Sequence, residues 1–125
     1  MLMITFANGK TYPVHEDTTI YPSGNRNIRN RMEIHIAEDK ITFDNFIALV
    51  SDEKATMTMR HTMTDDANKI IYDHTYTYYI ALAEVGKRRC DVVNVETGEV
   101  RSEYHLVAVL EQLTETEQKL RELEK

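Results

Sequence analysis

The chain has 125 residues, 42% of them hydrophobic, a formal net charge of −6 and a single cysteine. This length favours one domain, and the hydrophobic content is too high for an intrinsically disordered chain. The negative charge disfavours general binding to nucleic acid, and a lone Cys90 excludes an internal disulfide. We therefore expect one globular domain over residues 1–125, outside the disulfide-rich and basic nucleic-acid-binding classes.

Two further features bear on where the protein is found. No apolar run approaches the ~20 residues that a membrane-spanning helix needs. The opening segment Met1–Phe6 lacks the basic region and the small-residue cleavage site of a secretory signal peptide. We therefore expect a protein that is not secreted through a signal peptide.

The first predicted elements are strands joined by turns. Asn8-Gly9 separates Ile4–Phe6 from Thr11–Val14, and this dipeptide is typical of a type I′ hairpin turn, in which both central residues have positive φ. A turn over 22–27, rich in Asn and Gly, precedes the next strand. In that strand, three apolar residues alternate with polar ones: Met32, Ile34 and Ile36.

A helix and two strands are expected next. Apolar residues recur with helical spacing from Phe43 to Val50, and Thr42 is a suitable N-cap. Alternation then predicts a strand over Ala55–Met63 and a longer strand over Ile70–Ala83. Three tyrosines of the longer strand are predicted to share one face: Tyr72, Tyr76 and Tyr78.

The next predicted elements form a hairpin. A break at Val85–Lys87 precedes it, and Thr97-Gly98 forms its turn between strands at 90–95 and 100–110. The elements together indicate a mainly β, α+β fold: an antiparallel sandwich or bent sheet of about seven or eight strands, with one short internal helix and a short C-terminal helix. Periodicity leaves open whether the sheets close into a barrel.

The C-terminal helix is predicted over residues 114–124. Thr114 and Glu117 match a capping box, in which each side chain bonds the backbone N–H of the other residue. About ten residues are too few for an isolated helix to be stable, so this helix must dock on the sheet or on another chain. Its narrow apolar stripe contains Leu113, Thr116, Leu120 and Leu123.

The residues most able to carry chemistry are Cys90 and the histidines. No histidine pair has the HxxH or HExxH spacing of a metal site, so we interpret the histidines as core or sheet-face residues. The alternative is a metal ion bound by His15 with Glu16 and Asp17. Cys90 follows a basic run but is expected to pack as a small apolar residue. We expect no catalytic, cofactor-binding or metal-binding residues and no enzyme activity. The five histidines are His15, His35, His61, His74 and His105.

Contact surfaces are the remaining class of candidate. The tyrosine-rich strand and two basic clusters resemble surfaces on which single-stranded nucleic acid stacks, but the net charge of −6 disfavours nucleic acid. Tyrosine is also enriched at protein interfaces, so we expect a contact surface for protein. The predicted interface contains Tyr72, Tyr76, Tyr78, Leu113, Leu120 and Leu123.

Several segments follow one another in a familiar order. They are an opening hairpin (4–10), a Gly/Asn/Arg turn that leads into an alternating strand (24–36) and a short helix (41–52). A Thr-rich strand (55–62), an aromatic strand (72–76) and an ending (110–120) that contains Leu113-Thr114-Glu115-Thr116-Glu117 follow. This order resembles that of small phage and prophage proteins of Gram-positive bacteria, which are encoded among tail genes. The turn over 22–29 and the hairpin over 91–101 depart from the pattern.

The resemblance implies a non-enzymatic phage or prophage structural or assembly protein that is tail-associated, acts through protein–protein contacts and is made in the bacterial cytoplasm. Its expected partners are other virion or tail proteins and further copies of this chain, without membrane or nucleic acid. The resemblance carries over no catalytic or cofactor residue. The alternative is a small cytoplasmic module that binds a ligand or a peptide.

Overall fold

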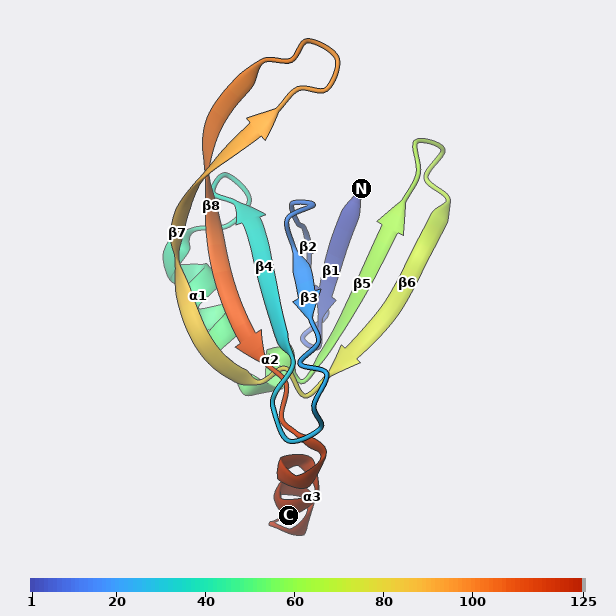
Figure 1. The fold of residues 1–125 in the computed structure, drawn as a ribbon, viewed down its shortest axis with the longest axis vertical. Coiled ribbons are helices and arrows are strands. Elements are labelled where there is room, and N and C mark those ends of the chain that lie inside the picture. The colour runs from blue at the N-terminus through green and yellow to red at the C-terminus, as the bar shows by residue number, and fades with distance from the viewer. Residues whose placement is uncertain (125) are drawn as a thin grey trace.

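The computed structural model describes residues 1–124, in which eight strands form two four-stranded antiparallel sheets (Figure 1). Sheet A contains, in spatial order, β2 (Thr11–Pro13), β1 (Leu2–Phe6), β5 (Thr58–Thr64) and β6 (Ile70–Thr77). Sheet B contains β3 (Thr19–Tyr21), β4 (Arg31–Ala37), β8 (Val100–Glu111) and β7 (Ala81–Val93). The helices are α1 (Phe43–Ser51), α2 (Glu53–Thr56) and α3 (Glu115–Leu123). The predicted mainly β, antiparallel fold is confirmed, and α2 is an additional helix.

The hydrophobic core is built from both sheets and from α1. Ile4 and Phe6 of β1 and Phe46 of α1 belong to one buried cluster. The helix α1 begins where predicted, with the Thr42 hydroxyl accepting a hydrogen bond from the N–H of Asn45. Alternate residues of β4 and β8 join the cluster in register: Met32, Ile34 and Ile36 pair with Leu110, Ala108 and Leu106. The intervening residues of these strands, including His35 and His105, therefore point to the opposite face.

A short segment, residues 14–18, joins the two sheets. The N–H of Val14 donates to the carbonyl of Leu2 in sheet A at 3.0 Å, and the N–H of His15 donates to the carbonyl of His35 in sheet B at 2.7 Å. The hydroxyl of Thr18 accepts from the N–H of His35 at 3.0 Å. The first bond holds Val14 beside β1, and the other two hold residues 15–18 beside β4.

The predicted strand over 70–83 and the break after it are wrong. Tyr78 adopts a left-handed conformation with φ of +65°, and there the chain passes from β6 in sheet A to β7 in sheet B. β7 then runs without a break through Gly86, which pairs with Val107 of β8. Tyr78 is therefore not on one strand face with Tyr72 and Tyr76.

Two smaller predictions also need correction. The strand predicted from Ala55 begins at Thr58, because the carboxylate of Asp52 accepts from the N–H of Lys54 and caps α2, which contains Ala55. The hairpin between β1 and β2 is confirmed, but only Gly9 of its turn has a positive φ, +86°, so the turn is not the predicted type I′.

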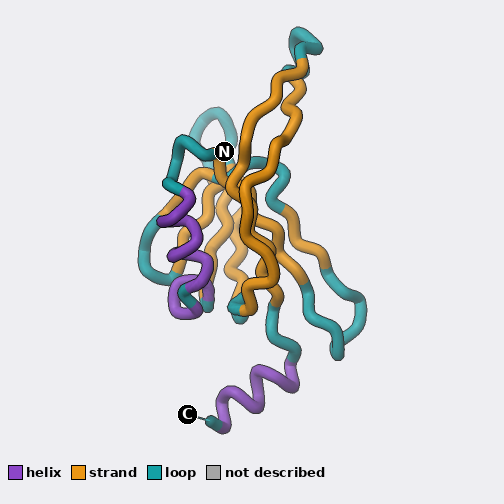
Figure 2. The backbone as a smooth tube through the Cα atoms, turned by 90° about the vertical axis from the view of Figure 1, so that its left-hand side faces the viewer, coloured by secondary structure: helices purple, strands orange, loops and turns teal. Residues whose placement is uncertain are grey.

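Two elements extend from opposite ends of the long axis (Figures 1 and 2). One is the outer part of the predicted hairpin, residues 91–102 of β7, β8 and their turn, which we call the arm; it continues past the end of β4. The other is α3, which follows β8 at the opposite end. Within the described residues, no helix is both long enough and apolar enough to cross a membrane.

Candidate functional site

The predicted interface residues fall into two separate groups. Tyr72 and Tyr76 lie on β6, where their hydroxyl oxygens are 2.6 Å apart. Tyr78 lies at the base of α3, where its hydroxyl donates to Glu122 at 2.8 Å and its carbonyl accepts from the N–H of Leu113. The structure therefore brings Tyr78 together with the helix residues and leaves the β6 tyrosines apart.

The first turn of α3 is attached to the body by a charged cluster. Arg29 donates from Nε to Glu117 at 2.9 Å and from Nη2 to the second oxygen of the same carboxylate, and a further bond reaches Glu111 at 3.2 Å. The predicted capping box between Thr114 and Glu117 is present. Hydrogen bonds from Arg29 and from the Thr114 backbone lower the pKa of Glu117 to about 2. This carboxylate thus both caps the helix and attaches it.

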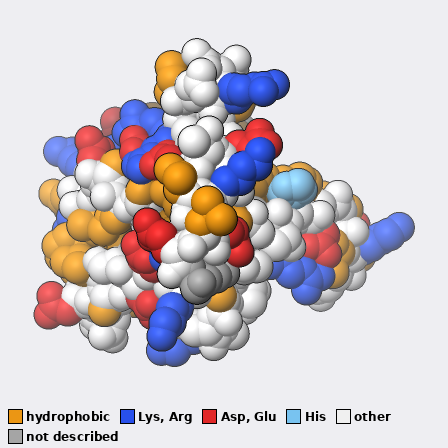
Figure 3. All heavy atoms as spheres, turned by 90° about the horizontal axis from the view of Figure 1, so that it is seen from below, with side chains coloured by type: hydrophobic (Ala, Val, Ile, Leu, Met, Phe, Trp, Pro, Cys, Tyr) orange, Lys and Arg blue, Asp and Glu red, His pale blue; other side chains and the backbone are white. Residues whose placement is uncertain are grey.

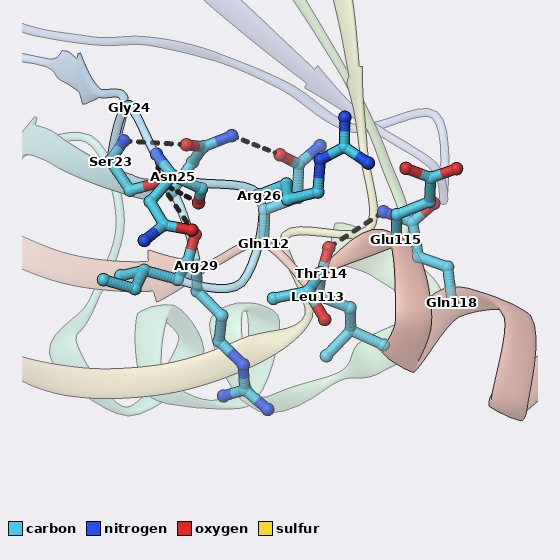
Figure 4. Close-up of a pocket in the computed structure, with 12 residues that line it drawn as sticks. Ser23, Gly24, Asn25, Arg26, Arg29, Gln112, Leu113, Thr114, Glu115 and Gln118 are labelled. Atoms are coloured by element: carbon cyan, nitrogen blue, oxygen red, sulfur yellow. Dashed lines mark hydrogen bonds between the residues drawn. The ribbon is translucent and has the colours of Figure 1, made fainter.

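Neutral polar contacts extend the attachment. The side chain of Asn30 accepts from the N–H of Ser23 at 2.9 Å and donates to Gln112 at 2.8 Å, and Gln112 donates to the carbonyl of Thr77. Figure 4 shows Ser23 and Gln112 on the walls of a pocket of about 350 Å³ between the 23–30 loop and the start of α3. Further along the helix, Arg121 donates to Glu53 at 2.7 Å.

The apolar side of α3, in contrast, is exposed. None of the described residues of α3 is buried, and Leu120 and Leu123 are 56% and 82% exposed. A shallow hollow of about 530 Å³ lies beside the helix, lined in part by Tyr78 and Leu123. Figure 3 views this end of the molecule and shows hydrophobic atoms in the middle of the face, among acidic and basic side chains. The helix is therefore held by polar contacts and leaves its leucines uncovered.

The arm presents a second exposed apolar group. Val93, Val95 and Val100 are 56%, 94% and 63% exposed near its tip. The tip itself is ordered by backbone bonds from Gly98 to Asn94 and from Asn94 to Glu99, with φ of +73° at Gly98. Valines with this exposure are therefore displayed on a defined hairpin rather than on an irregular loop.

A cluster of histidines and carboxylates lies on the face of sheet B that is turned away from the core. The Nδ1 atoms of His35 and His105 are 3.1 Å apart, and both residues are buried. The Nε2 of His35 is 2.8 Å from Glu33, and the Nε2 of His105 is 2.7 Å from Glu103. The ring of His15 packs on that of His105 at 4.4 Å between centroids.

The surroundings hold both carboxylates ionised. The hydrogen bond from His105 lowers the pKa of Glu103. Burial raises the pKa of Glu33, but hydrogen bonds from His35 and Arg88 outweigh it, so the pKa of Glu33 lies below its ordinary value. Both carboxylates therefore act as hydrogen-bond acceptors towards the histidine rings.

Two further side chains that can ligate a metal, those of Asp17 and Cys90, lie close to the histidine pair. One ligand atom each from Asp17, His35, Cys90 and His105 lies within 4.8 Å of all the others. Burial and the charge of Asp17 raise the pKa of the Cys90 thiol, which points towards the carbonyl of Arg88 at 3.8 Å. These four residues come from β4, β7, β8 and the 14–18 segment, so no local spacing in the sequence indicates that they meet.

His61 is a different kind of buried histidine. It lies on β5 in sheet A opposite His74, and its ring packs against Tyr76 at 4.6 Å between centroids. Its buried Nε2 has no hydrogen-bond partner among the described residues. Burial, together with the charge of the nearby His74, lowers the pKa of His61 to about 4. The interpretation of this histidine as a packed sheet residue agrees with its position.

Comparisons of the chain with models of protein families, with curated proteins and with solved structures find no match.

Proposed function

We propose that this chain is a non-enzymatic structural or assembly protein of the phage or prophage tail type, which acts through protein–protein contacts. The observation that carries the proposal is the attachment of α3. Ion pairs and hydrogen bonds fix the position of the helix, while Leu120 and Leu123 make no buried contact with the body. A short helix gains most of its stability from packing of an apolar face, so this face is suited to a partner.

A second copy of the chain is the partner that the arrangement favours. Exposed leucines on α3 and exposed valines on the arm lie at opposite ends of the long axis (Figure 1). A contact between the arm of one copy and α3 of the next is heterologous, and repetition of such a contact produces rings or filaments. The proposed assembly is therefore head-to-tail, with each chain using both ends.

The mass of the purified full chain at two protein concentrations tests this function. Light scattering should show oligomers whose share rises with concentration, and Leu120→Glu/Leu123→Glu should reduce them to monomers. Ile70→Glu/Ile71→Glu is the matched control, because these β6 residues are 53% and 58% exposed but lie on another element. A monomer at both concentrations contradicts the proposal, and so does equal loss of oligomers in the control.

The alternative, a ligand- or peptide-binding module, is best represented by the pocket beside α3. Its side chains from Ser23, Asn30 and Gln112 already bond one another or the backbone, so they offer few unsatisfied groups to a ligand. The exposed leucines have no such internal partner among the described contacts, and assembly is therefore the function that we favour.

A further inference from the structure

His35 and His105 on sheet B face each other through their Nδ1 atoms, an arrangement that is unfavourable for two neutral imidazoles alone. A carboxylate only accepts hydrogen bonds, so the Nε2 facing Glu33 and the Nε2 facing Glu103 each carry the ring proton. A neutral imidazole has one N–H, which leaves the Nδ1 of His35 and of His105 as bare lone pairs. These two acceptors face each other at 3.1 Å in a buried position, and a cation between them would remove the repulsion.

The separation of the two nitrogens fits one metal ion. Zinc–nitrogen bonds of about 2.0–2.1 Å in a tetrahedral site place two ligand nitrogens about 3.3 Å apart. The histidine–carboxylate bonds on the far side of each ring are also those of a metal site, where a carboxylate fixes the tautomer and orientation of the ligating imidazole. The histidine–carboxylate bond is present twice, once on β4 and once on β8.

Asp17 and Cys90 complete a set of four ligands. Their ligand atoms lie within 4.8 Å of those of both histidines, so shifts of about 1 Å would bring all four to bonding distance of a common centre. Two imidazoles, a thiolate and a carboxylate match the borderline-soft ligand preference of zinc, and exclude calcium and magnesium, which prefer oxygen. A surface hollow of about 460 Å³, lined in part by Asp17, His35 and Cys90, gives an ion a path to the centre.

We propose that Asp17, His35, Cys90 and His105 bind one zinc ion, with Glu33 and Glu103 orienting the histidines. Four protein ligands leave no open position, so the site is structural. It connects β4, β7, β8 and the 14–18 segment, and thereby fixes the base of the arm to sheet B. A second set, His15, Glu103 and His105, lies equally close but has no thiolate, and Glu103 already accepts the N–H of His105.

Cobalt substitution tests the proposal on the full chain. Metal is removed with a chelator, Co²⁺ is titrated in, and Zn²⁺ is then added while the absorption spectrum is recorded. We expect saturation at one Co²⁺ per chain, strong visible bands of a tetrahedral site and a thiolate-to-cobalt charge-transfer band, all abolished by Zn²⁺. Because wild-type protein alone gives this result, the test does not depend on the folding of a variant.

Two variants identify the ligands. Cys90→Ser should lose the charge-transfer band and His105→Asn should lower the Zn²⁺ affinity at least about tenfold, whereas His74→Asn, an exposed histidine of sheet A, should change neither. Far-UV circular dichroism checks that each variant is folded. A wild-type spectrum without the thiolate band overturns the proposal, whether Co²⁺ binds in an octahedral site or does not bind. Persistence of the band in Cys90→Ser overturns it as well.

Discussion

Arg29 and Glu117 are 88 positions apart in the chain, yet the guanidinium of Arg29 donates two hydrogen bonds to the Glu117 carboxylate at the first turn of α3. The same carboxylate accepts from the N–H of Thr114 and so completes the capping box. One side chain therefore both starts the helix and attaches it to the loop before β4. This pair, together with the bonds of Tyr78 to Glu122 and of Arg121 to Glu53, orients α3, because the leucines of the helix contribute no buried contact.

Arg29→Met should loosen the attachment of α3 to the body. The change removes the two bonds to Glu117 and the bond to Glu111, and at this exposure we expect a loss of about 0.5–1 kcal/mol in the opening free energy of the helix. Hydrogen exchange of the α3 amides measures it. Lys119→Met is the matched control, since its pair with Glu115 lies within the exposed helix. Equal protection of α3 in wild type and Arg29→Met would show that the pair does not hold the helix.

The attachment of α3 should weaken in acid. The pKa of Glu117 is about 2 in the folded protein, below the ordinary value of 4.5, because Arg29 and Thr114 bond the ionised form. The stabilisation is therefore complete above pH 4.5 and is lost as the pH falls from 4.5 towards 2. The NMR chemical shifts of the amides of residues 114 and 117 should follow this window in wild type and should change clearly less in Glu117→Gln. Equal changes in both proteins would contradict the assignment.

Elements whose sequence signal lies within a few neighbouring positions were predictable. The apolar alternation of β4, the N-cap of α1 and the capping box of α3 each involve residues within a few positions, and all three are confirmed. The end of β6 was not predictable, because the tyrosine alternation continues through Tyr78. Residues 78–80 separate β6 from β7, and Tyr78, which has a positive φ, is bonded through its backbone to Met57 and Leu113, both distant in the sequence.

His61 should make the whole domain less stable in mild acid. Its pKa is about 4 in the folded protein and about 6.5 in an unfolded chain, because burial disfavours the charged ring. The unfolded chain therefore binds a proton first, and stability should fall as the pH decreases from 6.5 to 4, by about 3 kcal/mol at most. Denaturant unfolding at several pH values should show a smaller decrease in His61→Gln. An identical decrease in both proteins would assign the pH dependence to other groups.

Glu103→Ala should weaken zinc binding without removing a ligand. The Glu103 carboxylate fixes the His105 tautomer through a 2.7 Å bond, and loss of such a partner lowers metal affinity by about 10–100-fold. Competition with a chromophoric chelator measures the Zn²⁺ Kd. Glu99→Ala, in the turn of the arm, is the control. Unchanged affinity in Glu103→Ala would mean that the carboxylate does not support the proposed site.

The proposed zinc site could not be predicted from the sequence. Its ligands at positions 17, 35, 90 and 105 have none of the close spacings of a metal motif, since each comes from a different element. The strand alternation correctly places His35 away from the core, but the meeting with His105 depends on the pairing of β4 with β8. The helix α3 and its apolar stripe were accessible to prediction, because a capping box and an apolar stripe are local features. The exposure of its leucines was not, because it depends on how the helix is attached to the body.

The most direct test of the central claim, head-to-tail assembly through α3 and the arm, is a mixing experiment. Leu120→Glu/Leu123→Glu disables one end and Val95→Glu disables the other, so each variant alone should be monomeric by light scattering. An equimolar mixture should form a 1:1 dimer and nothing larger, because each chain retains one of the two complementary ends. A mixture that remains monomeric, or a variant that still forms oligomers alone, would contradict the account.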